Sequence, residues 1–113
     1  MLRSDIREIC AEEEYVQRHR EALTSLLYRR SKLLCESSEE RMRRAQDNGE
    51  WRHLSPQECA ELHNEEKRYL KSQIDHLQHE QARTSRRLAE LRRLKARAKR
   101  IRAAEGAVGR KRH

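Results

Sequence analysis

The sequence is poor in residues that interrupt helices and in large aromatic side chains. Its 113 residues include one Pro, three Gly and no Phe, and aromatic residues make up 4%. An apolar fraction of 35% with so few aromatics excludes a thick globular core, whereas a charged fraction of 41% is typical of long helices and coiled coils. Low hydrophobicity with high charge is also typical of disorder, so the spacing of the apolar residues has to distinguish long helices from a disordered chain.

Cysteine is scarce, and long apolar runs are missing. The odd and widely spaced set of Cys10, Cys35 and Cys59 is not a disulfide framework and suits a reducing compartment. The longest uncharged run, Ala22 to Tyr28, is far shorter than the ~20 apolar residues of a membrane span, and the first fifteen residues lack the apolar centre of a signal peptide. We therefore expect no integral membrane segment and a cytoplasmic location, including the cytoskeleton, with the nucleus as the alternative.

The first half of the chain reads as one long helix. No Gly or Pro occurs between Asp5 and Gln46, and Asp5 with Glu8 forms a pattern similar to a capping box. Apolar residues recur in alternating steps of three and four, interrupted by Glu13, Arg20 and Arg30. This spacing predicts a helix over residues 5–46 with an imperfect heptad stripe.

The second helix has a clear start. Asn48-Gly49 marks a break, and Ser55, Pro56 and Glu58 then match the N-cap, the first helical position and the N3 position of a capping box. We predict a helix from Pro56 to about Ala104, after which Gly106 and Gly109 release the chain.

The two apolar stripes match if the chain folds back on itself. When facing residues have numbers that sum to about 103 or 104, the apolar positions of the two helices meet almost throughout, and acids of one helix lie across from arginines of the other. An antiparallel arrangement therefore explains both stripes, with exposed ion pairs of ~0.3–0.5 kcal/mol each selecting the orientation. The predicted coiled-coil seam consists of Ile6, Ile9, Val16, Leu23, Leu27, Leu34, Leu70, Ile74, Leu77, Leu88, Leu91 and Leu94.

The predicted fold class is therefore all-α, an antiparallel coiled-coil hairpin with a basic flexible C-terminal tail. Its parts are a first helix within 1–47, a turn at 48–55, a second helix at 56–104 whose basic end starts at 83, and a tail at 105–113. A lone two-helix hairpin is marginal in stability, so we expect self-association or a protein partner to cover apolar helix faces. The residues expected to anchor such a partner are Trp51, Tyr28 and Tyr69.

No pattern of residues predicts catalysis, and we expect a non-enzymatic protein without a cofactor. There is no Gly-rich phosphate loop, nucleophile elbow or P-loop, and the adjacent acids diverge around their helices. Cys59 and His63 lie four residues apart on one helix face, but His76 and His79 are too far along the same helix to complete a zinc site. We therefore expect no metal site.

The charge is divided unevenly along the chain. Residues 1–82 hold 14 Lys and Arg against 17 Asp and Glu, a net charge of −3, whereas residues 83–113 hold 13 against 2, a net charge of +11. Such a density of positive charge predicts binding to a polyanion or to an acidic protein surface. The residues assigned to this binding are Arg86, Arg87, Arg92, Arg93, Lys95, Arg97, Lys99, Arg100 and Arg102.

Two functions fit these features. The first is a structural or adaptor coiled-coil protein, a small component of a larger cytoskeletal, centrosomal or ciliary assembly, that docks on an acidic surface through residues 83–113. The alternative is an RNA- or DNA-associated, or ribonucleoprotein-associated, protein whose basic segment binds phosphates without sequence selectivity. Residues 83–113 contain no aromatic residue on which a base could stack, which argues against recognition of single strands by stacking.

Overall fold

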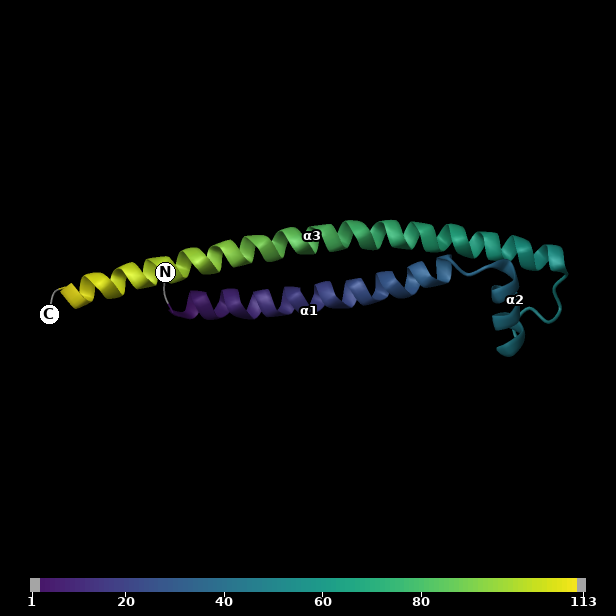
Figure 1. Cartoon of the computed structure of the whole chain (residues 1–113), viewed down its shortest axis with the longest axis horizontal. Coiled ribbons are helices and arrows are strands. Elements are labelled where there is room, and N and C mark those ends of the chain that lie inside the picture. The colour runs from purple at the N-terminus through teal and green to yellow at the C-terminus, as the bar shows by residue number, and fades with distance from the viewer. Residues whose placement is uncertain (1–2, 112–113) are drawn as a thin grey trace. The chain divides into compact units, whose positions relative to one another are not determined.

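The described part of the chain consists of helices joined by short irregular segments and turns. The computed structural model describes the backbone of residues 3–111 and the side chains of residues 5–107. Within this range there are three helices and no strand: α1 (Arg3–Leu34), α2 (Ser38–Asp47) and α3 (Pro56–Lys111) (Figure 1). The two long helices α1 and α3 pack against each other and run in opposite directions. The predicted all-α helical hairpin is confirmed at this level.

The predicted single helix over residues 5–46 is wrong, because the chain breaks at residues 35–37 and restarts as α2. Ser37 has an extended backbone and caps α2, since its hydroxyl accepts a hydrogen bond from the backbone N–H of Glu40 at 3.1 Å. The same hydroxyl donates to the Glu40 carboxylate at 3.1 Å. Ser-x-x-Glu at this point is a helix start signal of the kind that also precedes α3.

The turn before α3 contains the features that the sequence predicts and one that it does not. Gly49 has a positive φ of 72°, and the backbone N–H of Glu58 donates to the Ser55 hydroxyl at 3.2 Å while the Glu58 carboxylate accepts from the Ser55 N–H at 3.1 Å. This reciprocal pair caps α3 directly before Pro56. Trp51 also has a positive φ, of 60°, which is unusual for a bulky side chain.

The predicted end of the second helix near Ala104 is also wrong, because α3 continues to Lys111. Gly106 lies inside the helix, and a Cβ placed there would meet no atom within 4 Å. One exposed glycine costs a helix only about 1 kcal/mol relative to alanine, which is too little to end so long a helix. Residues 112–113 of the predicted flexible tail, and the side chains after Ala107, lie outside the described part of the chain.

The chain divides into two compact units. Unit 1 combines Met1–Leu23 with Glu80–His113, and unit 2 consists of Thr24–His79. Each unit contains a part of α1 and a part of α3, and unit 2 also contains α2 and the turn.

The seam of unit 1 lies between the first part of α1 and the second part of α3. On α3, buried or half-buried residues follow the helical spacing of three and four, and Leu88 and Leu91 are each only 1% exposed. The α3 positions in this series are Thr84, Leu88, Leu91, Lys95 and Ala98. The α1 positions that face the seam are Ile6, Ile9, Glu13, Val16, Arg20 and Leu23.

Leu94 is the one predicted seam residue that the structure places outside the seam. It is 39% exposed, and the neighbouring Lys95 occupies the seam position instead. Lys95 Nζ lies 2.6 Å from Glu13 Oε2, although the angle at this contact is not that of a hydrogen bond. The ion pair, and the aliphatic stem of Lys95 along the seam, explain why a lysine takes this place.

Unit 2 has a core that is partly polar. Buried residues here come from α2 and from the first turns of α3, namely Arg41, Ala45, Cys59 and His63. The predicted seam residues of this unit are all half-buried: Leu27, Leu34, Leu70, Ile74 and Leu77. α2 runs crosswise to the neighbouring ends of α1 and α3 (Figure 1). The apolar seam therefore gives way to a charged cluster where α2 packs.

Candidate interaction surface and a cluster of paired charges

Two of the nine cations that the sequence assigns to polyanion binding are paired with acids of α1. Arg87 Nε donates to Glu12 Oε1 at 3.0 Å, and Arg87 Nη1 donates to Glu90 on its own helix at 3.1 Å. These hydrogen bonds, the one to Glu12 above all, raise the pKa of Arg87 above its ordinary value. Lys95 is half-buried beside Glu13. Both positive charges are thus neutralised within unit 1.

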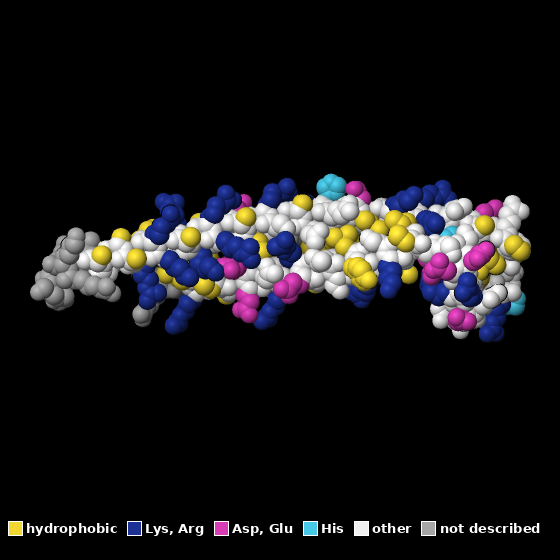
Figure 2. All heavy atoms as spheres, viewed as in Figure 1, with side chains coloured by type: hydrophobic (Ala, Val, Ile, Leu, Met, Phe, Trp, Pro, Cys, Tyr) yellow, Lys and Arg dark blue, Asp and Glu magenta, His cyan; other side chains and the backbone are white. Residues whose placement is uncertain are grey.

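The other seven cations are exposed and have no ion pair within the described residues. Four of them are separated by seven, four and three residues, which places them on one face of α3 directed away from α1. We call these four residues the outer basic face: Arg86, Arg93, Arg97 and Arg100. Figure 2 shows Lys and Arg side chains gathered along unit 1, with apolar side chains between them.

An exposed leucine accompanies the outer basic face. Leu94 lies beside Arg93, Arg97 and Arg100, and together with Glu90 and Ala96 they line one open depression on α3. This arrangement can contact an acidic partner with charge and with an apolar side chain at the same place.

The three remaining cations, Arg92, Lys99 and Arg102, do not belong to the outer basic face. Arg92 lies near acids of α1, in a depression that Glu13, Glu14 and Glu21 also line. Lys99 and Arg102 are exposed. The nine assigned residues therefore do not form one surface.

The three predicted partner anchors, all in unit 2, differ in their surroundings. Trp51 is half-buried, with the Arg41 guanidinium carbon 3.8 Å from its ring centre, so its ring is a packing partner of α2. Tyr28 and Tyr69 are 67% and 64% exposed. The Tyr69 hydroxyl accepts a hydrogen bond from the Gln73 amide at 2.9 Å. Only the two tyrosines remain open to a partner.

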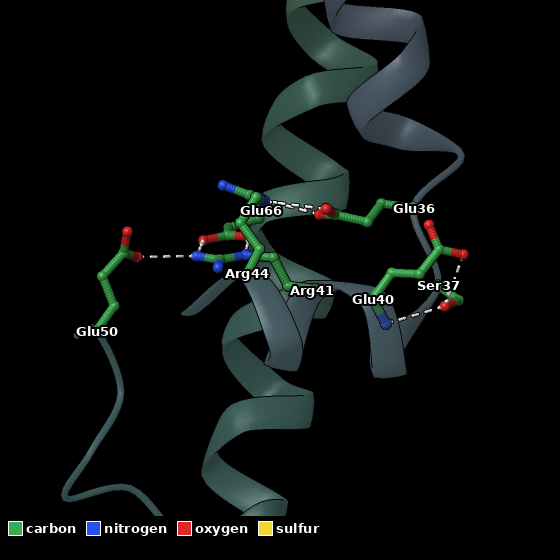
Figure 3. A network of polar contacts seen from close by, with 7 residues as sticks. All are labelled: Glu36, Ser37, Glu40, Arg41, Arg44, Glu50 and Glu66. Atoms are coloured by element: carbon green, nitrogen blue, oxygen red, sulfur yellow. Dashed lines mark hydrogen bonds and ion pairs between the residues drawn. The ribbon is translucent and has the colours of Figure 1, made fainter. Parts of the chain in front are cut away.

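A cluster of paired charges joins the helices of unit 2 (Figure 3). Arg41 donates to both carboxylate oxygens of Glu66 on α3, at 2.7 and 2.8 Å, and to Glu50 in the turn at 3.2 Å. Arg44 donates to both carboxylate oxygens of Glu36 at 2.9 Å. Bidentate pairs of this kind are the strong and directional form of arginine–carboxylate contact. They attach α2 to α3, to the turn and to the segment that follows α1.

These pairs change the acidity of their members. The hydrogen bond from Arg41 lowers the pKa of Glu66, and the hydrogen bond from Arg44 lowers the pKa of Glu36, both below the ordinary glutamate value. Conversely, the hydrogen bond to Glu66 raises the pKa of Arg41, and that to Glu36 raises the pKa of Arg44. The four groups therefore stay charged at neutral pH.

Sequence reasoning missed this cluster, which lies beside Cys59 and His63, the two residues four apart on one helix face. His63 is 4% exposed and Cys59 is 5% exposed, on the same buried face of α3. No group of three or more His, Cys, Asp or Glu that could hold a metal ion occurs among the described residues. The signal that could have revealed α2 is Ser37 with Glu40, because a second helix start marks a break after which the chain can change direction.

Comparisons with known proteins give no match: no family model, no curated protein and no solved structure is similar to this chain. Across the described helices, none combines the length and apolar character that crossing a membrane requires. The residues themselves must therefore support any proposed function.

Proposed function

We propose that this chain is a non-enzymatic helical adaptor that docks on an acidic protein surface through the outer basic face. The observation that carries the proposal is the position of Leu94, a leucine 39% exposed beside Arg93 and Arg97. A phosphate backbone offers little to such a side chain, whereas a protein surface with acids around an apolar site can contact both. Charge complementarity of this kind raises association rates and selects partners.

The contrast with the paired cations supports the same proposal. Arg87 and Lys95 are neutralised by acids of α1, so they do not add to the free positive charge. Those of the outer basic face have no acid partner among the described residues, and no fold contact in this range explains four arginines on one face. A cytoskeletal, centrosomal or ciliary assembly in the cytoplasm is the setting we favour, because filament lattices present repeated acidic surfaces.

Binding to RNA or DNA is the second candidate, supported by the same four arginines. Such binding would follow the phosphates, so that log K would fall by about 0.9 per neutralised phosphate on duplex DNA for each tenfold rise in salt. It would not depend on Leu94.

The test compares two variants of equal charge loss. In the first, the outer basic face is neutralised by R86Q, R93Q, R97Q and R100Q. In the control, four exposed arginines elsewhere are changed by R7Q, R29Q, R43Q and R68Q. Co-sedimentation with microtubules and with actin filaments, and fluorescence anisotropy with RNA, are measured across a salt series.

We expect the natural chain to bind filaments. The first variant should bind them with at least tenfold lower affinity, and the control should bind them as the natural chain does. L94S should also weaken filament binding, and RNA binding, if any, should be insensitive to it. Equal losses for the two four-residue variants would contradict a dedicated face. Tight RNA binding that L94S leaves unchanged, without filament binding, would favour the second candidate.

A further inference from the structure

A cavity at the charged cluster of unit 2 has the features of a binding site that the proposed function does not use. It is a half-open cavity of about 200 Å³ where α1, α2 and α3 meet. This is several times the ~30 Å³ that one water occupies in the liquid, yet below the ~300–1,000 Å³ of a drug-sized ligand site. The space therefore fits a small ion or a single functional group.

The deep wall of the cavity carries polar groups without partners. His63 is 4% exposed, and neither of its ring nitrogens has a hydrogen-bond partner among the described residues. Arg41 is 3% exposed and has no partner at Nη1 in the described part of the chain, although its other nitrogens bond to Glu66 and Glu50. Buried polar groups are nearly always hydrogen-bonded, so two such side chains beside one cavity indicate that something occupies it.

The charge around the cavity favours an anion. The half-buried Arg30 and Lys67 also line it, and neither has an ion pair within the described residues. The acids in the lining, Glu36 and Glu66, are each held by a bidentate arginine and are therefore neutralised. The residues that line the cavity carry four positive and two negative charges, a net charge of +2, and Glu50, which also pairs with Arg41, lies outside this lining.

The chemistry of these groups resembles that of an oxyanion site. Two arginines, a lysine and an imidazole present several N–H donors to one small volume, and guanidinium groups suit the oxygens of phosphate or carboxylate. A monocarboxylate would neutralise only half of the excess charge, whereas a phosphate group with a charge near −2 matches it. We propose that this cavity binds a phosphate group, either as free orthophosphate or as a phosphate monoester, between Arg41 and His63 at the base and Arg30 and Lys67 at the rim.

The first experiment measures the thermal unfolding midpoint while orthophosphate replaces chloride at constant ionic strength. We expect the midpoint to rise with phosphate concentration for the natural chain. Arg30 and Lys67 are half-buried and take part in no ion pair among the described residues, so the double variant R30Q with K67Q should still fold. It should need at least tenfold more phosphate than the natural chain for the same rise in the midpoint. The matched control K71Q removes an exposed charge one turn from Lys67 and should respond as the natural chain does.

The second experiment follows the ring proton resonances of the histidines by NMR, with H63Q used to assign His63. Addition of orthophosphate should shift the His63 resonance and leave the exposed His19 and His79 unchanged. Saturation by orthophosphate but not by O-phosphoserine assigns the site to the free ion, and saturation by both assigns it to phosphate monoesters as well. An unchanged His63 resonance, or equal midpoint shifts for R30Q with K67Q and for K71Q, would overturn the proposal.

The two proposals fail independently. The cavity lies within unit 2, whereas the outer basic face lies within unit 1. Loss of filament binding in the variant of the outer basic face therefore leaves the phosphate response intact, and the reverse holds for R30Q with K67Q.

Discussion

Arg41 and Glu66 form a bidentate ion pair between α2 and α3, with donor–acceptor distances of 2.7 and 2.8 Å. The Arg41 side chain is 4% exposed, while that of Glu66 is 40% exposed. One face of the guanidinium also lies on the Trp51 ring. A buried arginine of this kind is stable in place only while its carboxylate partners remain charged.

Removing the negative charge of Glu66 should loosen α2. We expect E66Q to lower the free energy of unfolding by roughly 1–3 kcal/mol, below the 3–5 kcal/mol of a fully buried pair because Glu66 is partly exposed. Urea unfolding followed by circular dichroism gives the value. E65Q is the matched control, since Glu65 is exposed and has no ion pair among the described residues, and it should change stability by less than about 0.5 kcal/mol. Equal effects of E65Q and E66Q would contradict the assigned role of the pair.

Acid should weaken the same cluster. The pKa values of Glu66 and Glu36 are lowered in the folded chain, so both carboxylates contribute stability above the ordinary glutamate pKa of 4.5 and lose it as the pH falls through their folded values. We therefore expect the unfolding free energy to decline progressively below about pH 4.5. Measured between pH 7 and pH 3, E66Q should show a shallower decline than the natural chain. A parallel decline would mean that other carboxylates cause the acid sensitivity.

Two leucines three residues apart on α3 can be compared in unit 1. Leu91 is 1% exposed and Leu94 is 39% exposed, although both fit an apolar stripe in the sequence. L91A should cost about 2–5 kcal/mol, as expected for a buried leucine, and L94A less than about 1 kcal/mol. Thermal or urea unfolding of the two variants measures the difference. A larger loss for L94A would contradict the assignment of Leu91, rather than Leu94, to the seam.

The helix caps can be tested at two places. S55A removes the hydroxyl that accepts from the Glu58 N–H, and S37A removes the one that accepts from the Glu40 N–H. Each should lower stability by about 1 kcal/mol, whereas S38A, within the first turn of α2, should have little effect. Amide hydrogen exchange should rise first in α2 for S37A and in the first turn of α3 for S55A.

The features that could be predicted are those that depend on residues close together in the sequence. The steps of three and four between Ile6 and Leu34 place every member of that series at least partly in the interface, including Glu13 and Arg20. The start of α3 follows from Ser55, Pro56 and Glu58 because a capping box involves only neighbouring residues. Such signals need no knowledge of the rest of the fold.

The features that could not be predicted depend on contacts between distant residues. Lys95 displaces Leu94 from the seam because Glu13 lies opposite, and a hydrophobic pattern alone favours the leucine. Arg41 is buried because Glu66 and Glu50 receive its hydrogen bonds, which an exposed-looking charged stretch does not reveal. The break before α2 contains no Gly or Pro, so only the pair of Ser37 and Glu40 marked it.

The half-buried pair of Glu13 and Lys95 affects the register between the α1 and α3 segments of unit 1. Sliding one helix past the other by seven residues would keep apolar residues opposite each other, because the stripe repeats at that interval. It would also move the ammonium about 10 Å from the carboxylate and leave the Lys95 charge partly desolvated and opposite Ile6 or Arg20, neither of which is a counterion. The apolar residues allow several alignments of nearly equal energy, and this pair penalises all but one of them.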